Sequence, residues 1–328
     1  MAKNFDEWNR PLKELEDGIE KLREFARREE DALKRVDLET KIDELEHRRD
    51  TYVDVMFQRL GPWEKVLVAR APKRPYTLDY VASIFTDYVE LQGDRRGFTD
   101  NAIVGGPALL DGMPVMVVGH QKGRNIQERQ FRNFGMAKPE GYRKAIRLFD
   151  MAERFGMPVI SFVDTPAADP GVESESRGIS EAIAAGMFRM FGLTVPSIAI
   201  VIGEGGSGGA IGIAASNRVL MQEHAVYSVI PPEGCAAILW RMPERGPEAA
   251  QALKLTAESA MEFGIIDEIV PEPSGGAHRD PIEAAGIVKD AIVKHLAELQ
   301  RLSPEEIKAQ RYAKFREMGI FESAGVKN

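Results

Sequence analysis

Cysteine is almost absent from this 328-residue chain, which has a single one, Cys235. One thiol excludes an internal disulfide and a zinc site built from several cysteines, so we expect no metal in this chain. No apolar run approaches the roughly 18 residues that would span a bilayer. The N-terminus also lacks the basic-then-apolar order of a signal peptide. The sequence therefore predicts a cytoplasmic protein with no membrane partner.

Excess positive charge is absent as well, since the formal net charge is −8 at pH 7. This balance argues against nucleic acid as a partner, although a local basic patch can coexist with an acidic whole. Such a patch consists of Lys122, Arg124, Arg129, Arg132, Arg143, Lys144 and Arg147. Two interpretations stay open, a solvated helical face and a surface that binds a polyanionic ligand such as a nucleotide phosphate.

The first 60 or so residues carry dense, alternating charges. Apolar residues recur every three or four positions from Leu12 to Leu22 and again from Leu38 to Tyr52. This spacing predicts two amphipathic helices, with a break near Val36-Asp37 and an end at Gly61-Pro62. Such a hairpin has little core of its own, so we expect residues 1–62 to form a helical region that packs on the main body or on a partner subunit.

The most informative stretch is an apolar run that leads directly into glycines, Pro196-Ser-Ile-Ala-Ile-Val-Ile-Gly203 followed by Glu204-Gly-Gly-Ser-Gly-Gly209. This order predicts a buried strand, a tight loop and the start of a helix. Glycine has no Cβ atom, so another backbone or a ligand can come close to such a loop. Amide N–H groups that converge at a helix N-terminus favour negative charge, whether phosphate, carboxylate or a developing oxyanion.

The same layout occurs about 38 residues earlier, which indicates a repeated supersecondary unit. An apolar run from Met157 to Val163 leads into the loop Asp164 to Gly171, and a helical pattern follows over 176–184. A further strand is expected over 114–120, after the turn Leu110-Asp-Gly112.

The C-terminal third has a helix-to-strand pattern. We predict a helix from Leu253 that ends at Gly264 and leads into a short strand ending at Val270. A turn-rich loop follows over 271–281, and the remainder, 282–318, is again typical of amphipathic helix.

The glycine-rich stretch also fits the G-x-G-x-x-G pattern of dinucleotide-binding folds. That pattern requires a full crossover helix, and the segment Ala210 to Ser216 leaves too short a helix for one. A phosphate-binding P-loop is excluded, because no Gly-Lys-Ser/Thr follows the glycines. The sequence therefore argues against dinucleotide binding and excludes a P-loop.

Several longer strings are similar to those of a known family. They are Arg74-Pro-Tyr-Thr-Leu-Asp-Tyr-Val81, Gly119-His-Gln-Lys-Gly123, Asn133-Phe-Gly-Met136, Pro139-Glu-Gly-Tyr-Arg-Lys-Ala145, Gly203-Glu-Gly-Gly-Ser-Gly-Gly-Ala210, Pro232-Glu-Gly-Cys-Ala-Ala-Ile-Leu-Trp240 and Gly275-Gly-Ala-His-Arg279. On these strings, the chain resembles the α subunits of the bacterial multi-subunit acetyl-CoA carboxylase carboxyltransferases.

The resemblance implies an α/β crotonase-like fold, a spiral of ββα units over 63–318, with an N-terminal helical hairpin, C-terminal helices and a tail over 319–328. The implied reaction moves a carboxyl group from carboxybiotin to acetyl-CoA and gives malonyl-CoA for fatty acid biosynthesis. Biotin would be carried on a separate biotin carboxyl carrier protein, which biotin carboxylase serves. The implied partner is a zinc-bearing β subunit of the same fold, in an α2β2 heterotetramer.

The implied chemistry needs N–H donors for two oxyanions, one on the biotin ureido group and one on the thioester enolate. The two loops are the candidates, with donors at Ala167, Ala168, Gly205, Gly206, Gly208 and Gly209. The expected substrate-binding residues are His120, Lys122, Arg124 and Arg177, with a structural imidazole and a plain salt bridge as the alternatives for His120 and Arg177. No protein base is required, because the biotin nitrogen can take the proton.

One loop departs from the family pattern. The family has Asp-Thr-Pro-Gly-Ala-Tyr-Pro-Gly, whereas this chain has Asp164-Thr-Pro-Ala-Ala-Asp-Pro-Gly171. Ala167 keeps its N–H group, while Asp169 adds a negative charge where an aromatic residue is usual. Either this change alters the acyl preference of the site or Asp169 faces solvent. Two alternative functions stay open, another crotonase-fold acyl-CoA enzyme (a hydratase or a decarboxylase) acting alone and a non-catalytic scaffold.

Overall fold

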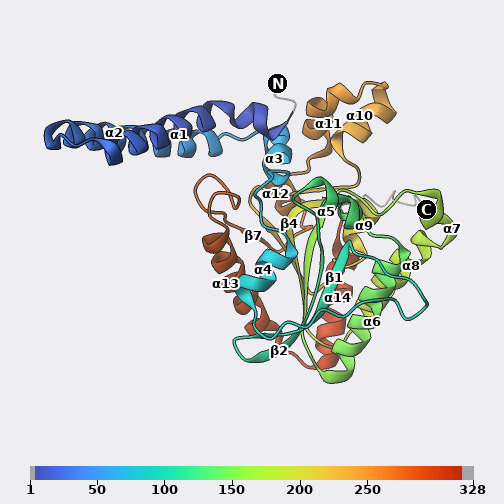
Figure 1. Cartoon of the computed structure of the whole chain (residues 1–328). Helices are drawn as coiled ribbons and strands as arrows, with labels where there is room; N and C mark the ends of the chain where they lie inside the picture. The colour runs from blue at the N-terminus through green and yellow to red at the C-terminus, as the bar shows by residue number, and fades with distance from the viewer. Residues whose placement is uncertain (1–3, 320–328) are drawn as a thin grey trace, which may run out of the picture.

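The computed structural model describes residues 4–319, and a mixed sheet forms the centre of this part of the chain (Figure 1). The strands are β1 Ile103–Leu110, β2 Met113–His120, β3 Val159–Thr165, β4 Ser197–Gly206, β5 Arg218–Gln222, β6 Val226–Ser228 and β7 Glu268–Val270. Their order is β1-β2-β3-β4-β5-β7, and β6 pairs with β4. β1 and β2 are antiparallel, and the other neighbours are parallel.

Helices cover both faces of the sheet. The α-helices are α1 Phe5–Arg28, α2 Ala32–Phe57, α3 Pro62–Ala69, α4 Thr77–Ile84, α5 Ile126–Phe131, α6 Pro139–Phe155, α7 Val172–Ser176, α8 Ile179–Gly192, α9 Ser207–Ile211, α10 Pro232–Trp240, α11 Gly246–Leu253, α12 Ala257–Glu262, α13 Pro281–Leu299 and α14 Pro304–Glu317, and the 3₁₀ turns are η1 Asn133–Gly135 and η2 Pro243–Arg245. One apolar cluster joins the sheet to α6, α8 and α12. A second cluster joins the opposite face to α4 and α13.

The predicted strand–loop–helix units are present. β3 and β4 cover the apolar runs at 157–163 and 196–203, and every residue of both strands is buried. A parallel strand covered by helices on both faces reads as a continuous apolar run, because neither face meets water. This explains why these two runs could be recognised in the sequence.

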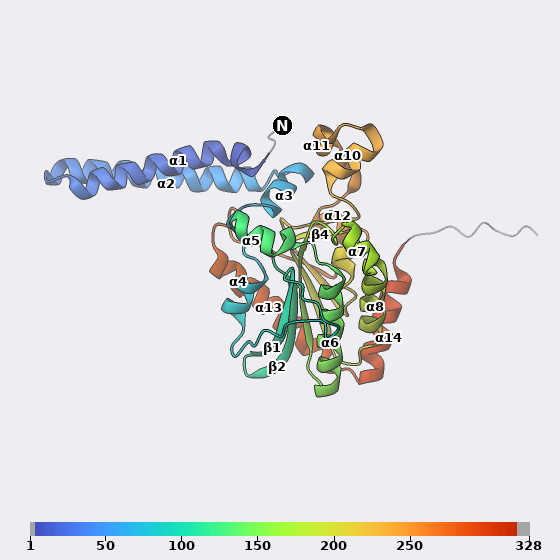
Figure 2. The same cartoon turned by 45° about the vertical axis from the view of Figure 1, so that its right-hand side comes forward.

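The N-terminal hairpin of α1 and α2 extends away from the sheet in both views (Figures 1 and 2). The two helices bury a narrow apolar seam between them, including Ile19 and Ile42. At its root, Phe57 packs near His278 and the side chain of Ser274 donates to Asp54 (2.7 Å). The hairpin is thus attached to the body at one end.

The predicted break in the hairpin is wrong in position. It lies at residues 29–31 rather than at Val36-Asp37, because Asp31 caps α2 by accepting hydrogen bonds from the backbone of Leu33 and Lys34. The second helix ends at Phe57, and Gly61 instead precedes the first residue of α3.

The helix predicted over 253–264 is also corrected. Lys254 has a left-handed backbone (φ 53°) that ends α11, and α12 begins only at Ala257. Gly264 (φ 67°) follows α12, and β7 lies at 268–270 as expected. The expected helix 282–318 is divided into α13 and α14. The proposed domain boundaries at 62 and 318 stay predictions, and apart from Gly319 the predicted tail lies outside the described residues.

Candidate active site at the carboxyl edge of the sheet

The candidate loops lie together at one edge of the sheet. β3 and β4 are parallel neighbours, so the segments that follow Thr165 and Gly206 leave the sheet side by side. The ladder pairs Thr165 with Gly205, after a register shift between Val163 and Thr165. This arrangement is the ordinary place for a ligand in an open α/β sheet, outside the carboxyl ends of the strands.

The glycines let the two loops touch. A Cβ atom on Gly206 would lie 1.9 Å from the carbonyl oxygen of Pro166, and one on Gly209 would lie 2.6 Å from the backbone of Ala167 and Ala168. Gly208 differs, because a Cβ atom there would meet only the Ile183 side chain, at 3.5 Å. Gly206 and Gly209 are therefore required by the contact between the loops, and Gly208 is not.

The candidate amides are not equivalent. The N–H of Ala167 donates to the hydroxyl of Thr165 (3.3 Å), and Gly205 lies within the ladder between β3 and β6. Gly208 and Gly209 lie in the first turn of α9, where N–H groups have no partner within the helix. The first turn of α9 is therefore the better source of free donors.

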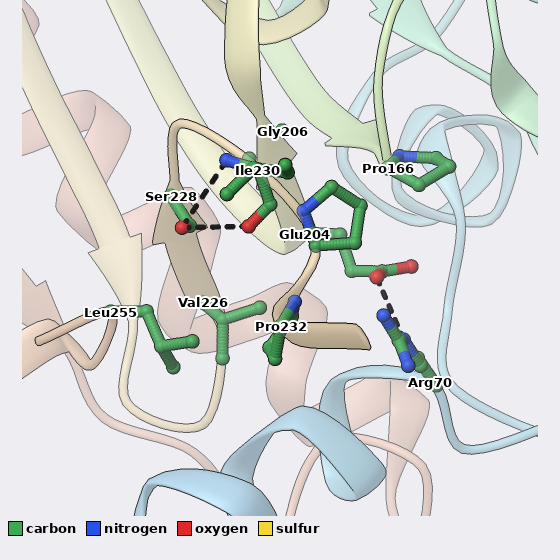
Figure 3. Close-up of a pocket in the computed structure, with 11 residues that line it drawn as sticks. Arg70, Pro166, Glu204, Gly206, Val226, Ser228, Ile230, Pro232 and Leu255 are labelled. Atoms are coloured by element: carbon green, nitrogen blue, oxygen red, sulfur yellow. Dashed lines mark hydrogen bonds and ion pairs between the residues drawn. The ribbon is translucent and has the colours of Figure 1, made fainter. Parts of the chain in front are cut away.

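Two hollows flank the glycine loop. The first is an open hollow of about 260 Å³, including solvent space at its mouth, and is lined by Pro166, Gly206, Arg70 and Glu204, among others (Figure 3). The second is also open to solvent and measures about 960 Å³ on the same basis, and its lining residues include Ser207, Gly208, Tyr227, Lys254 and Phe263. Ser228, the last residue of β6, lines both, so the segment 226–230 borders two spaces of different size.

A chain of buried charges lies beneath the loops. The ammonium group of Lys122 binds Asp164 Oδ1 (2.7 Å) and Glu204 Oε2 (2.8 Å). Arg70 binds the other oxygen of Glu204 (2.7 Å) and also Glu233 on α10 (2.5 Å). Asp164 additionally accepts from the backbone N–H of Glu204 (2.9 Å). These bonds tie the ends of β3 and β4 to each other.

The pKa values of this network reflect competition between burial and pairing. Burial alone would raise the pKa of Glu204, but Lys122 and Arg70 outweigh it and lower that pKa to about 2. For Lys122, burial opposes the charged form, yet Asp164 and Glu204 raise its pKa above the usual value. Burial instead raises the pKa of Asp164, although Lys122 opposes this shift. The charge pair that these shifts favour is therefore that of Lys122 with Glu204.

His120, the last residue of β2, is completely buried. Burial, with Lys122 acting in the same direction, lowers the pKa of its imidazole to about 3. Among residues 4–319, neither ring nitrogen has a hydrogen-bond partner of normal geometry. The backbone of Gly209 and of Phe162 acts in the opposite direction to burial on this pKa, but does not outweigh it. His120 is thus a neutral core residue at pH 7 in this structure.

The buried imidazole predicts a pH dependence of stability. The unfolded chain takes up a proton on this histidine below its ordinary pKa near 6.5, whereas the folded chain does so only near 3. The free energy of unfolding should therefore fall by about 1.4 kcal/mol between pH 7.5 and 5.5 on account of this group. Denaturant unfolding at both pH values should show this contribution vanishing in His120→Leu. The contribution should remain in His47→Gln, which changes an exposed histidine. If the difference in the free energy of unfolding between pH 7.5 and 5.5 is the same in His120→Leu as in the parent, the assignment is contradicted.

Two other predicted binding residues, Arg124 and Arg177, form ion pairs with carboxylates of this chain. Arg177 binds Glu140 (2.7 Å) and Glu173 (2.5 Å), the salt-bridge alternative, and Arg124 binds Asp79 (2.5 Å). The seven residues of the basic patch do not form one surface, since Lys144 is buried and the ammonium group of Lys122 is bound by Asp164 and Glu204.

Sequence reasoning missed the acidic members of the site. Asp164 and Glu204 each stand at the carboxyl end of a fully buried strand, which was the available signal. Their cationic partners could not be inferred, because Lys122 lies 82 positions from Glu204 and Arg70 lies 134 positions away.

Comparison with known proteins identifies the family. The model of the family described as acetyl co-enzyme A carboxylase carboxyltransferase-like matches residues 5–319. The chain belongs to this family. The acetyl-coenzyme A carboxylase carboxyl transferase subunit alpha of Acaryochloris marina is 54% identical over 315 residues, covering 96% of this chain and 95% of that protein. The same subunit of Geobacter metallireducens is 53% identical, over 98% and 99% of the two chains.

Solved structures agree with the carboxyltransferase family in fold. Transcarboxylase 12S, with methylmalonyl-coenzyme A and methylmalonic acid bound, matches with a TM-score of 0.52 and 22% identity, over 67% of this chain and 44% of that one. A Pseudomonas malonate decarboxylase hetero-tetramer in complex with coenzyme A matches with a TM-score of 0.54 and 18% identity, over 66% and 89%. The resemblance and the crotonase-like fold are therefore confirmed, and the chain is a carboxyltransferase subunit of the alpha type.

Two features are absent from residues 4–319. This part of the chain has no helix that is both long and apolar enough to cross a membrane. It also has no group of three or more His, Cys, Asp or Glu side chains placed to hold a metal ion.

Proposed function

We propose that this chain supplies one half of a two-subunit active site, which moves the carboxyl group of carboxybiotin on a carrier protein to acetyl-CoA and forms malonyl-CoA. The observation that carries the proposal is the contact between the two loops at the carboxyl edge of the sheet, where Gly206 meets Pro166 and Gly209 meets Ala167. Backbone N–H groups gather there beside two hollows.

The reaction places negative charge on two oxygens. Release of CO₂ from carboxybiotin leaves charge on the ureido oxygen, and removal of a methyl proton from the thioester gives an enolate oxygen. Preorganised N–H donors in a dry site stabilise such charges, and losing one donor costs on the order of 3 kcal/mol. Two hollows on the two sides of one glycine loop suit a reaction with two such oxygens.

We assign the donor role to the backbone of Ala168, Gly208 and Gly209. Ala167, Gly205 and Gly206, also predicted as donors, support the loop geometry in this proposal, because the first already donates to Thr165 and the other two lie within the ladder with β6. Lys122, with Asp164 and Glu204, orients both loops from below. The proton goes to the biotin nitrogen, so no side chain of this chain acts as the base.

The second half of the site is proposed to come from a zinc-bearing β subunit. The first hollow is bordered by Pro232, the first residue of α10. The same helix exposes Ile238 (73%) and Leu239 (64%), an apolar surface beside the site that suits a protein partner. We further propose an α2β2 assembly in the cytoplasm, which receives carboxybiotin from a carrier protein charged by biotin carboxylase.

The test is reconstitution. The purified chain should not transfer carboxyl groups between malonyl-CoA and free biotin until the β subunit is added, because half of the donors are missing. Rapid turnover by the isolated chain would contradict the proposal and favour a single-chain acyl-CoA decarboxylase or hydratase. No turnover with the β subunit present, despite a stable complex, would favour a scaffold.

A further inference from the structure

The turn η1, at the carboxyl edge of the sheet, has an unusual backbone. Three consecutive residues have positive φ angles, Asn133 at 45°, Phe134 at 55° and Gly135 at 78°. Glycine adopts this conformation freely, but a bulky residue such as phenylalanine does so rarely and at a cost in free energy. Phe134 is therefore held in a strained conformation.

The turn lies between the buried charges and the loop that follows β3. A Cβ atom on Gly135 would lie 2.8 Å from the Lys122 side chain and 3.4 Å from the carbonyl oxygen of Asp164. On the other side, the side-chain amide of Asn133 donates to Asp169 Oδ1 (3.2 Å) and to the carbonyl of Met136 (2.8 Å). The turn is thus fixed against the candidate donor loop.

Asp169 is the centre of this attachment. Its second carboxylate oxygen accepts a hydrogen bond from Ser174 on α7, and its backbone N–H donates to Ala137 (3.0 Å). The charge that the sequence places here therefore neither faces solvent freely nor stands alone in a pocket. It connects the loop to the turn that carries Phe134.

The strained backbone leaves much of the aromatic side chain accessible, since 45% of Phe134 remains exposed. Residues held in such conformations concentrate at ligand sites, where the surrounding contacts fix them. We propose that Phe134 contacts the apolar part of a substrate bound at the two loops, and that Asp169 is the positioning residue for it. This inference rests on the proposed function, because the substrate is either biotin or an acyl thioester.

The first test uses the complex with the β subunit and measures transfer from malonyl-CoA to free biotin. In Phe134→Ala, KM for one of these two substrates should rise about tenfold, the loss expected for one aromatic contact, with kcat within about twofold. The substrate whose KM changes identifies the ligand. Phe134→Tyr should restore the KM, and Phe131→Ala, which removes an exposed phenylalanine (60%) three residues away, should have no effect.

A glycine variant separates function from folding. Phe134→Gly removes the strain, so its melting temperature should be equal to or above that of the parent, while its KM rises as in Phe134→Ala. A lower melting temperature together with an unchanged KM would show that the phenylalanine is structural and would overturn the proposal.

The role of Asp169 is tested by a double-mutant cycle. Asp169→Ala should raise the same KM as Phe134→Ala, and the double variant should be no worse than the poorer single variant, because Asp169 acts through Phe134. Additive effects would overturn the positioning role. The substrate contact would be overturned if the Phe134→Ala complex were active with unchanged KM values. It would also be overturned if this variant bound the β subunit more weakly instead. An inactive parent complex would count against the proposed function itself.

Discussion

Replacing Gly206 with alanine is expected to lower kcat for carboxyl transfer at least about 100-fold, the effect of losing one oxyanion donor. The added Cβ atom would lie 1.9 Å from the carbonyl oxygen of Pro166, so one of the two loops must move. The sheet below is held by a fully buried strand and should keep its structure. Steady-state kinetics of the complex with the β subunit and a melting curve measure the two effects separately.

The chain offers a matched series for this experiment. Gly209→Ala should behave like Gly206→Ala, because its Cβ atom would lie 2.6 Å from the backbone of Ala167 and Ala168. Gly208→Ala is the control, since its Cβ atom would meet Ile183 at an ordinary 3.5 Å and the residue has no positive φ. If all three variants keep activity within a few-fold of the parent, the contact between the loops has no part in catalysis.

Replacing Lys122 with methionine is expected to lower the free energy of unfolding by about 3–5 kcal/mol, the cost of breaking a buried ion pair. Asp164 would lose its cation, and Glu204 would keep only Arg70. Activity should fall as well, because the two carboxylates fix the ends of β3 and β4. Urea unfolding and kcat of the reconstituted complex are the measurements.

The pH dependence of the Lys122 variant has a definite sign. In the parent, the pKa of Glu204 is about 2, below its ordinary value of 4.5, so its contribution is complete above pH 4.5 and is lost as the pH falls toward 2. Without Lys122 this pKa rises, and the contribution shrinks at every pH. Lys289→Met, which breaks an exposed pair with Asp111, should cost less than about 1 kcal/mol. Equal losses in both variants would contradict the buried network.

The parts of the fold that could be predicted are those in which local sequence agrees with tertiary structure. β3 and β4 read as apolar runs followed by glycine or proline because both faces are buried, and their loops were recognised for the same reason. The hairpin could be predicted as two helices, but not its break, because charged residues continue through 28–37 and the deciding contact is the cap at Asp31.

The site was less predictable because its side chains meet only in three dimensions. Lys122 was expected to bind substrate, and its actual partners lie on two later strands. Asp169 was recognised as unusual, but its bond to Asn133 crosses 36 positions of sequence. Similarly, Phe134 was noted only as part of the string Asn133-Phe-Gly-Met136, and its strained backbone is known only from the structure.

Because the hairpin is attached to the body at one end, a rotation at that end displaces its far end. α1 has 24 residues, so its length is about 36 Å at 1.5 Å per residue. Arg279 binds Glu16 halfway along this helix, so about 12 residues, or about 18 Å, extend beyond that contact, and a rotation of about 10° there would displace the far end by about 3 Å. The direction of the arm depends on the contacts at this joint, which include those of Phe5 and Phe57 with His278, of Leu12 with Val68 and of Arg279 with Glu16 (2.6 Å). A small packing change there therefore changes where the far end of the hairpin lies.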